Sequence, residues 1–342
     1  MILRPYQERL VKQAKAALKK RRNTLAIAAT GAGKTIMLAA LAREMGGKTL
    51  ILQHRQELVE QNMRKFKLVN PEWTCSVFDA TSKLMHGDAV FAMAQTLTKN
   101  LDQLPVFDHI IHDEVHHVVA PSFARIVEAC REKNKKVMLS GFTATPERSD
   151  KKSLRRFFDN VASQVSIREL VGLGFLVPPR AFVVDVGVQG KLQNIQKQSA
   201  FGDQTEVAEV LDTRPINEEV VKHWKEKAGD RQTIVFCSTV KHATDVAEAF
   251  KCAGVASGVV SGEMPNGERR NIVSSFDKGQ TQVLCNVGVL TEGFDSQPVS
   301  CVILLRLCSD KGPLIQMAGR GLRTVDPNLY PGVVKKDCII LD

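Results

Sequence analysis

A glycine-rich segment near the N-terminus has the residue types that bind phosphate groups. It runs from Ala28 to Thr35 and reads Ala-Ala-Thr-Gly-Ala-Gly-Lys-Thr, between a predicted strand and a predicted helix. This is the spacing of a P-loop, G-x-x-x-x-G-K-[ST], except that Ala28 stands in place of the first glycine. The glycines let backbone N–H groups approach phosphate because they carry no Cβ. We therefore predict a nucleotide-binding loop with contacts from Thr30, Gly31, Ala32, Gly33, Lys34 and Thr35.

The last two residues of this loop have the chemistry to act on the phosphates themselves. Lys34 is predicted to pair with the β- and γ-phosphates, and the hydroxyl of Thr35 to bind Mg²⁺. The helix that begins near Lys34 adds the positive end of its dipole. ATP and Mg²⁺ are thus the expected cofactors. P-loops also serve kinases, GTPases and transporters, so the loop alone does not define the reaction.

A pair of acidic residues follows a second predicted strand. Residues 109–112 are apolar enough for a buried strand, and Asp113 and Glu114 come directly after it. An aspartate at the end of such a strand, beside a P-loop, is the expected second Mg²⁺ ligand after Thr35. Glu114 is then placed to orient or deprotonate the attacking water. Adjacent carboxylates are common on protein surfaces, so this pair supports hydrolysis only in combination with the P-loop.

These motifs require alternating strands and helices, and the sequence has that rhythm, which is typical of α/β domains with parallel sheets. It appears twice, so we predict two similar lobes, residues 1–176 and 177–342, with an ATP cleft between them. A linker or small insertion is expected around 177–230, and the polar stretch 186–205 suits a mobile connection. Predicted strands are 24–29, 49–53, 89–92, 109–112, 137–142, 233–237, 258–260, 282–285 and 301–305.

The composition favours a chain that works on a polyanion away from membranes. Of 342 residues, 44% are apolar, and the net charge is +10. Basic proteins attract nucleic acid. No apolar run approaches the ~20 residues that span a bilayer, and the first residues do not resemble a signal peptide. A cytoplasmic location is expected. The eight cysteines form no C-x-x-C pair, so we interpret them as buried thiols and not as a zinc site.

The P-loop and the tetrad at 113–116 together resemble the DEAD/DEAH-box (DExH) motors of helicase superfamily 2. The subgroup resembles RadD-type bacterial proteins and phage helicases and, more distantly, the XPB and type I restriction motors. Val115 replaces the more usual Ala or Cys of the tetrad, which is a conservative change. Other segments match the family's motifs in order: 3–7 (Q motif), 53–58 (Ia), 91–97 (Ib), 142–146 (III), 234–239 (IV), 286–295 (V) and 316–323 (VI).

The resemblance implies two tandem RecA-like lobes that hydrolyse ATP. Gln7 would bind the adenine edge, with Arg4 nearby, and Gly293 and Asp295 would add nucleotide contacts. The guanidinium groups of motif VI would donate N–H bonds to the γ-phosphate as charge builds up in the transition state. Arg320 and Arg323 are three residues apart and share one face if a helix continues there. The implied catalytic set is Lys34, Asp113, Glu114, Gln316, Arg320 and Arg323.

The resemblance also implies a nucleic-acid partner, with DNA favoured over RNA because most of the subgroup acts on DNA. Contacts to backbone phosphates carry little sequence information, so we expect little base preference and marked salt dependence. No membrane partner is expected. The default oligomeric state is a monomer, and an additional domain or partner protein stays open. The implied contacts are His54, Arg55, Gln95 and Thr96 in the first lobe and Ser238, Thr239 and Thr291 in the second.

The implied function is an ATP-dependent helicase or translocase that moves along or separates strands. Three alternatives stay open. The first is a translocase or remodeller on duplex DNA that does not separate strands, because the same motor core serves both. The second is a motor subunit for a nuclease, whose cutting residues would lie elsewhere. The third is of another class: a nucleotide-dependent clamp or partner-recruiting switch with little turnover.

Overall fold

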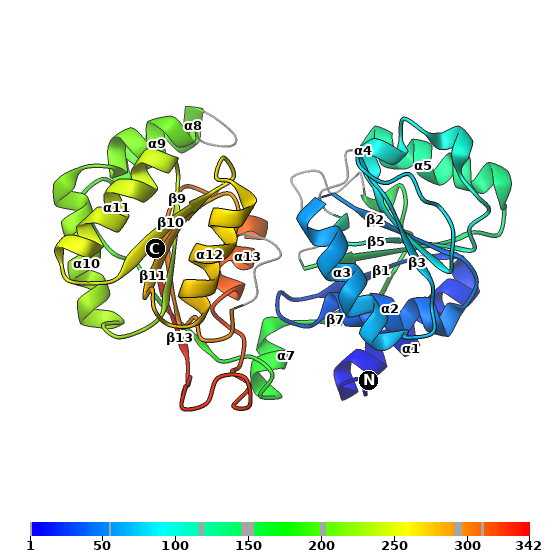
Figure 1. The fold of residues 1–342 in the computed structure, drawn as a ribbon, viewed down its shortest axis with the longest axis horizontal. Helices are drawn as coiled ribbons and strands as arrows, with labels where there is room; N and C mark the ends of the chain where they lie inside the picture. Colours follow the sequence, from blue (N-terminus) through cyan, green and yellow to red (C-terminus); the bar gives the residue numbers. More distant parts are fainter. Residues whose placement is uncertain are drawn as a thin grey trace. The chain divides into compact units, whose positions relative to one another are not determined.

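The structure, a computed structural model, describes residues 2–54, 56–115, 120–144, 154–198, 203–290, 296–308 and 311–342. The chain forms two compact units, Met1–Leu170 (unit 1) and Val171–Asp342 (unit 2), each built on one parallel sheet (Figure 1). The predicted α/β class with parallel sheets is confirmed. The boundary at 176/177 and the cleft between lobes stay predictions.

Unit 1 has a seven-stranded sheet in the order β3-β4-β2-β5-β6-β1-β7. All its strand pairs are parallel, so the carboxyl ends of the strands lie along one edge. Its strands are β1 (Asn23–Ala28), β2 (Thr49–Gln53), β3 (Cys75–Phe78), β4 (Ala89–Met93), β5 (His109–His112), β6 (Met138–Thr143) and β7 (Val161–Val165). Its helices are α1 (Pro5–Arg21), α2 (Lys34–Met45), α3 (Gln56–Val69), α4 (Ala94–Leu97) and α5 (Ala120–Lys133), with α7 (Ile167–Gly172) at the junction of the units.

The strands of unit 1 are buried because helices cover both faces of the sheet (Figure 1). On one face α5 packs Phe123, Ile126 and Val127 against inward residues of the strands such as Leu50 and Ile110. Helices α1, α2 and α3 cover the other face. Parallel strands buried on both faces are almost continuously apolar. Charged groups are therefore confined to positions beyond the strand ends.

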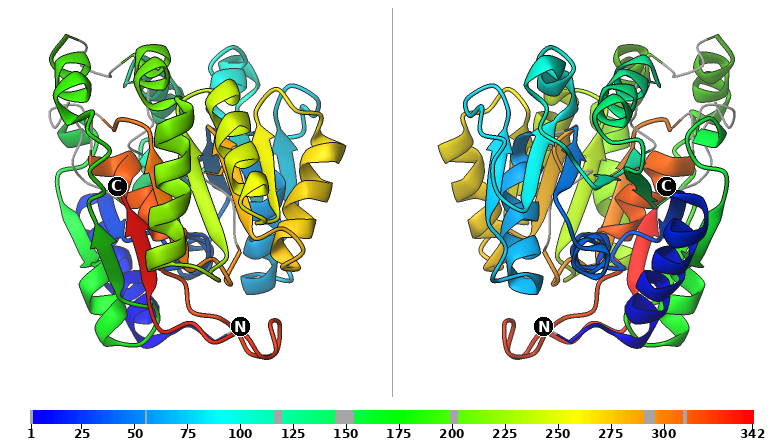
Figure 2. Two further views of the ribbon diagram at one scale, coloured as in Figure 1. Left: turned by 90° about the vertical axis from the view of Figure 1, so that its left-hand side faces the viewer. Right: turned by 90° about the vertical axis from the view of Figure 1, so that its right-hand side faces the viewer.

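Unit 2 repeats this architecture with six parallel strands in the order β10-β11-β9-β12-β13-β8. Helices α10 and α11 lie side by side over one face (Figures 1 and 2). The strands are β8 (Pro179–Phe182), β9 (Thr233–Cys237), β10 (Ser257–Ser261), β11 (Val283–Val287), β12 (Cys301–Leu305) and β13 (Cys338–Leu341). The helices are α8 (Gln189–Gln198), α9 (Gln204–Leu211), α10 (Arg214–Lys227), α11 (Val240–Cys252), α12 (Asn266–Asp277) and α13 (Lys311–Gly319).

Trp224 on α10 anchors the core of unit 2. It is 1% exposed and packs edge-on against Phe250 of α11, with ring centroids 5.2 Å apart. Its indole N–H donates to the hydroxyl of Thr233 on β9 at 2.7 Å. A buried tryptophan needs such an acceptor, because an unpaired N–H would add a desolvation cost.

The structure differs from the sequence expectation between residues 177 and 230. This range holds strand β8 and helices α8, α9 and α10, where the sequence favoured a linker or small insertion. The polar stretch 186–205 contains the whole of α8, whose Ile195 is buried with Val207 and Leu211 of α9. The few apolar residues of this stretch pack against one another. The sequence analysis did not identify them because Gln and Lys predominate around them.

The described residues bear on two expectations from composition, which concern the burial of the cysteines and the membrane-spanning segments. Five cysteines are buried and all eight are free thiols, but Cys252 is exposed, contrary to the general expectation of burial. Among the helices in the described ranges, none has the length and apolar content needed to cross a bilayer.

A buried histidine lies in the middle of the unit 1 sheet. His109, the first residue of β5, is fully buried, and its Nε2 lies 2.8 Å from the Ser140 hydroxyl of β6. Burial lowers its pKa to about 3, because the charged imidazolium would lose its hydration. The ring is therefore neutral in the folded protein at all ordinary pH values.

Acidification is expected to destabilise unit 1 through His109. Below its ordinary pKa of about 6.5 the unfolded chain takes up a proton, whereas the folded chain takes it up only near pH 3. The free energy of unfolding should therefore fall by up to about 1.4 kcal/mol per pH unit as the pH drops through this window. Urea unfolding followed by Trp73 fluorescence in a Trp224→Phe background measures unit 1, because each unit contains one of the two tryptophans.

A matched pair of variants isolates this effect. His109→Gln keeps a hydrogen-bonding group for Ser140 and removes the titration, so its stability should depend less on pH. His86→Gln, at an exposed histidine of the same unit, should keep the wild-type slope. Equal slopes for wild type and His109→Gln would show that His109 is not the titrating group.

Candidate nucleotide-binding site

The P-loop forms a tight turn between β1 and α2. Gly31 and Gly33 have φ angles of +86° and +77°, which side chains with a Cβ rarely adopt. The turn closes through the Ala32 N–H, which donates to the Ala29 carbonyl at 3.0 Å. Helix α2 then begins at Lys34, so its free N-terminal amides point toward the loop. The Thr30 hydroxyl oxygen is buried and has no hydrogen-bond partner among the described residues.

Two side chains at the start of α1 hold the P-loop from outside. The Tyr6 hydroxyl and the Gln7 side-chain amide both donate to the Ala32 carbonyl, at 2.9 and 3.1 Å. Gln7 Oε1 also accepts from the Arg4 backbone N–H at 3.0 Å. Burial raises the pKa of Tyr6, so its phenol stays a donor. Gln7, predicted to bind adenine, is therefore also a support for the phosphate loop. Tyr6 was not predicted to be a site residue.

Lys34 and Glu114 form an ion pair at the end of β5. The Lys34 Nζ lies 2.9 Å from Glu114 Oε1, and the two side chains are only 12% and 14% exposed. Glu114 has a φ of +51°, a left-handed conformation that is strained for a residue with a side chain and is concentrated at functional sites. This backbone conformation directs the Glu114 carboxylate toward Lys34 of the P-loop. The structure thus brings together two residues that are 80 positions apart in the sequence.

Asp113 lies beside this pair and is nearly fully buried. Burial raises its pKa, the neighbouring Glu114 carboxylate raises it further, and Lys34 acts in the opposite direction. Its Oδ2 accepts a hydrogen bond, whereas Oδ1 is buried without a hydrogen-bond partner within the described ranges. A carboxylate oxygen in this condition is a strong candidate for a cation ligand, because a cation would offset its desolvation.

One residue that the sequence analysis did not identify joins these groups. Asn62 of α3 is 5% exposed. Its Oδ1 accepts from the Thr35 hydroxyl at 3.1 Å, and its Nδ2 donates to Asp113 Oδ2 at 3.1 Å and to Gln53 Oε1 at 3.2 Å. A sequence signal existed, since Asn62 interrupts the apolar stripe of α3 between Val59 and Phe66.

The residues present fit a magnesium ion. Thr35 and Asp113, the two predicted ligands, hydrogen-bond to the same Asn62 side chain, so their oxygens lie close together. Hydroxyl and carboxylate oxygens are the ligands that Mg²⁺ prefers, usually with waters and substrate phosphates completing its shell. The assignment of the ion itself stays a prediction.

The candidate nucleic-acid contacts of unit 1 follow neighbouring strands at the same sheet edge. His54 comes directly after β2 and is partly buried, and Gln95 and Thr96 lie in α4 directly after β4. Gln95 is exposed and Thr96 is partly buried. Strands β4, β2 and β5 are adjacent in the sheet, so these residues continue the edge that carries Asp113. Arg55 lies outside the described residues.

In unit 2, two of the three hydroxyl residues predicted to contact nucleic acid make hydrogen bonds that stabilise the fold. The Ser238 hydroxyl donates to the Leu305 carbonyl at 3.1 Å and is buried. Thr239 caps α11, where its hydroxyl oxygen accepts from the His242 N–H at 3.2 Å. Each therefore has a structural reason for its residue type. Their contact with nucleic acid stays a prediction, and Thr291, Gly293 and Asp295 lie outside the described residues.

The motif VI residues are mostly buried in unit 2. Gln316 and Arg320 are 5% and 8% exposed. Helix α13 ends at Gly319, and Arg323 pairs with Leu176 in an isolated antiparallel bridge. The two arginines therefore do not share a helical face, which was the condition we attached to their spacing. Burial lowers the pKa of Arg323 to about 10, so it remains charged near neutral pH.

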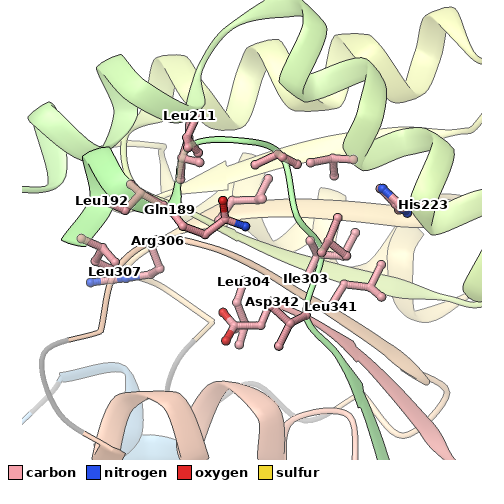
Figure 3. A pocket seen from close by; sticks show the side chains of 16 residues that line it. Gln189, Leu192, Leu211, His223, Ile303, Leu304, Arg306, Leu307, Leu341 and Asp342 are labelled. Atoms are coloured by element: carbon pink, nitrogen blue, oxygen red, sulfur yellow. The ribbon is translucent and has the colours of Figure 1, made fainter. Parts of the chain in front are cut away.

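A concave surface lies in unit 2 beside α8, α9 and α10 (Figure 3). Its lining is mainly aliphatic, with Val184, Leu211 and Leu341 among its residues. Its charged members, Arg306 and Asp342, have opposite signs. This lining does not suit a triphosphate, so we place the nucleotide site at the P-loop and not here.

Comparison with known proteins gives the chain its family. Residues 1–148 match the family profile described as type III restriction enzyme, res subunit. Residues 215–325 match the helicase conserved C-terminal domain. The chain belongs to helicase superfamily 2. This assignment agrees with the P-loop and acidic pair in unit 1 and with the motif VI residues in unit 2.

Two yeast proteins whose names describe ATP-dependent helicases are similar to this chain along nearly its whole length. The mitochondrial protein irc3 of Schizosaccharomyces pombe is 32% identical over 99% of this chain and 57% of its own length. IRC3 of Saccharomyces cerevisiae is 28% identical over 94% of this chain and 49% of its own length. The chain thus spans about half the length of these relatives.

Solved structures show the same two-lobed RecA-like fold. The type ISP restriction-modification enzyme LlaBIII, solved bound to DNA, superposes with a TM-score of 0.72 at 17% identity, over 100% of this chain and 27% of that chain. Dbp5 of S. cerevisiae, solved bound to RNA and ADP BeF3, has a TM-score of 0.65 at 16% identity, over 99% of this chain and 83% of that chain. At these identities the likeness concerns the fold alone.

Gly33→Ala is expected to weaken nucleotide binding about tenfold or more. A Cβ at this position would lie 2.7 Å from Gln7 Nε2, so the loop or Gln7 must move. Gly46→Ala is the matched control, because its φ of +69° is similar but nothing lies within 4 Å of the added Cβ. Gly33→Ala should lose about 1–2 kcal/mol of stability from its left-handed backbone. Gly46→Ala should lose more, because the ψ of −177° at Gly46 belongs to a region used almost only by glycine. Only Gly33→Ala should lose affinity for a fluorescent ADP analogue, and equal affinities would refute the crowding argument.

Proposed function

We propose that the chain is the motor core of an ATP-dependent helicase or translocase, with DNA as its track. The observation that carries the proposal is the meeting of Lys34, Glu114 and Asp113 at one sheet edge, with Lys34 and Glu114 2.9 Å apart. The named relatives support strand movement as the purpose of this ATPase. The restriction-enzyme profile matched by residues 1–148 supports DNA over RNA, and the net charge of +10 suits either polymer.

ATP binding would redistribute the charges of this cluster. The γ-phosphate competes with Glu114 for Lys34, because a multiply charged anion attracts the ammonium group more strongly. Glu114 is then released to accept a proton from the attacking water. Thr35 and Asp113 would hold Mg²⁺, which neutralises charge on the phosphate oxygens. The helix α2 amides and the glycines of the loop bind the same phosphates.

Nucleic acid would bind farther along the same edge of unit 1. We propose that His54, Gln95 and Thr96 contact its backbone, because they follow β2 and β4 beside the nucleotide elements. In unit 2, Arg320 and Arg323 are proposed to donate to the transferring phosphoryl group. The backbone around Arg323 is well fixed for this purpose, since the Val177 N–H donates to the Leu322 carbonyl at 2.8 Å.

ATP hydrolysis should be stimulated by DNA and abolished by Lys34→Ala. The variant removes the cation that pairs with Glu114 and that the phosphates require. The measurement is steady-state phosphate release with no polymer, single-stranded DNA, duplex DNA and single-stranded RNA, at several salt concentrations. Each backbone phosphate neutralised on a single strand should contribute about 0.7 to the salt dependence of binding.

The same assay separates the alternatives. Stimulation by duplex without oligonucleotide unwinding, together with triplex displacement, would indicate a duplex translocase. Tight binding with negligible turnover under every condition would overturn the motor proposal in favour of a clamp or switch. Lys15→Ala is a suitable control, because Lys15 pairs with Glu44 on the outside of unit 1 at 2.6 Å.

Glu114→Gln should separate binding from hydrolysis. The amide is isosteric but cannot accept a proton, so single-turnover hydrolysis should fall by about 10²–10⁴-fold. Affinity for Mg²⁺-ATP should be kept or increase, because Lys34 no longer has a charged competitor. Glu128→Gln, an exposed position on α5, provides the control. Hydrolysis at the wild-type rate in Glu114→Gln would exclude Glu114 as the base.

A further inference from the structure

Asn62 occupies the junction of three elements of unit 1. Its side chain joins the first turn of α2 through Thr35, the end of β5 through Asp113 and the end of β2 through Gln53. It is nearly fully buried, so water does not compete freely for these bonds. No motif identified in the sequence contains it.

The chemistry of the partners fixes how this amide is oriented. The ionised Asp113 carboxylate only accepts hydrogen bonds, so the Asn62 NH₂ group must face it. The second N–H of that group is taken by Gln53 Oε1 at 3.2 Å. The Asn62 oxygen is left to accept from Thr35 at 3.1 Å. Each donor and the acceptor of the amide thus has a defined partner.

These bonds leave free the atoms that a cation would use. The single hydroxyl proton of Thr35 points to Asn62, so both lone pairs of its oxygen are available. Asn62 binds Oδ2 of Asp113, and the other carboxylate oxygen has no hydrogen-bond partner within the described part of the chain. Ligating carboxylates at metal sites are generally held by such outer hydrogen bonds, which orient them without binding the ion.

We propose that Asn62 is a positioning residue that orients Thr35 and Asp113 for Mg²⁺, with Gln53 holding the amide in place. The inference rests on the proposed ATP site and adds to it a residue outside the motifs. Asn62 acts through Thr35 and Asp113 and does not touch the reacting atoms. Loss of such an orienting partner typically costs about 10–100-fold in metal affinity.

The test is nucleotide binding without turnover, using Asn62→Leu, which is similar in size and has no hydrogen-bonding group. Affinity for a fluorescent ADP analogue is measured in Mg²⁺ and in EDTA, and the ratio of the two gives the contribution of the ion. We expect this ratio to fall about 10–100-fold in Asn62→Leu, with little change of affinity in EDTA. Asn70→Leu is the matched control, because Asn70 is 2% exposed and donates to the Ala39 carbonyl at 2.9 Å, away from the ligands.

The outcomes are distinguishable. An unchanged ratio in Asn62→Leu, with the wild type responding to Mg²⁺, overturns the role of Asn62 alone. Absence of any Mg²⁺ effect in the wild type overturns the proposed ATP site instead. An equal fall in Asn62→Leu and Asn70→Leu would assign the effect to general loosening of α3 and reject the proposal. If Asn62→Leu does not fold, the smaller Asn62→Ala is measured in the same way and judged by the same ratio.

Discussion

Parallel pairing of buried strands is the constraint on which the site of unit 1 depends. Helices cover both faces of the sheet, so the strand interiors carry apolar side chains and little that could do chemistry. The first positions open to charge are those beyond the strand ends. Because every strand runs in the same direction, these positions gather along one edge. Residues far apart in the sequence, such as Lys34 and Glu114, therefore meet without any special local signal.

The charged side chains at this edge are largely buried. The ionisation of each therefore depends on the charges beside it. Lys34 pairs with Glu114 and also acts on the neighbouring Asp113, which is the more buried of the two acidic residues. Burial and the second carboxylate both disfavour ionisation of Asp113. A divalent cation would reverse this balance by favouring the charged form. Binding of a metal nucleotide would therefore stabilise the ionised form of Asp113, which is consistent with a binding site.

The sequence predicted those features that follow from strong local patterns. The P-loop, the acidic pair and the alternation of strands and helices are all readable from residue types at fixed spacing. Asn62 and Tyr6 were missed because their roles arise from tertiary contacts, to Asp113 and to Ala32, across many residues. Ser238 and Thr239 show the converse, since a motif match concealed their structural hydrogen bonds.

The region of α8 and the end of α13 were misjudged for different physical reasons. Helix α8 has only two large apolar residues, Leu192 and Ile195, so its periodicity is too weak to stand out among Gln and Lys. At Arg320 the spacing of three suggested a continued helix. The backbone instead leaves α13 at Gly319 and pairs with the segment at Leu176. Pairing of that kind is set by distant chain segments and has no signature in the local sequence.

The two hydrogen bonds of Gln7 have a consequence for the choice of nucleotide. The side chain expected to recognise the base is also bonded to the carbonyl that shapes the phosphate loop, with Tyr6 on the same acceptor. Recognition of the base and binding of the phosphates are therefore not independent properties of this protein. A substitution at Gln7 designed to admit a different purine would also remove a donor to this backbone carbonyl, which would then depend on Tyr6 alone of these two donors.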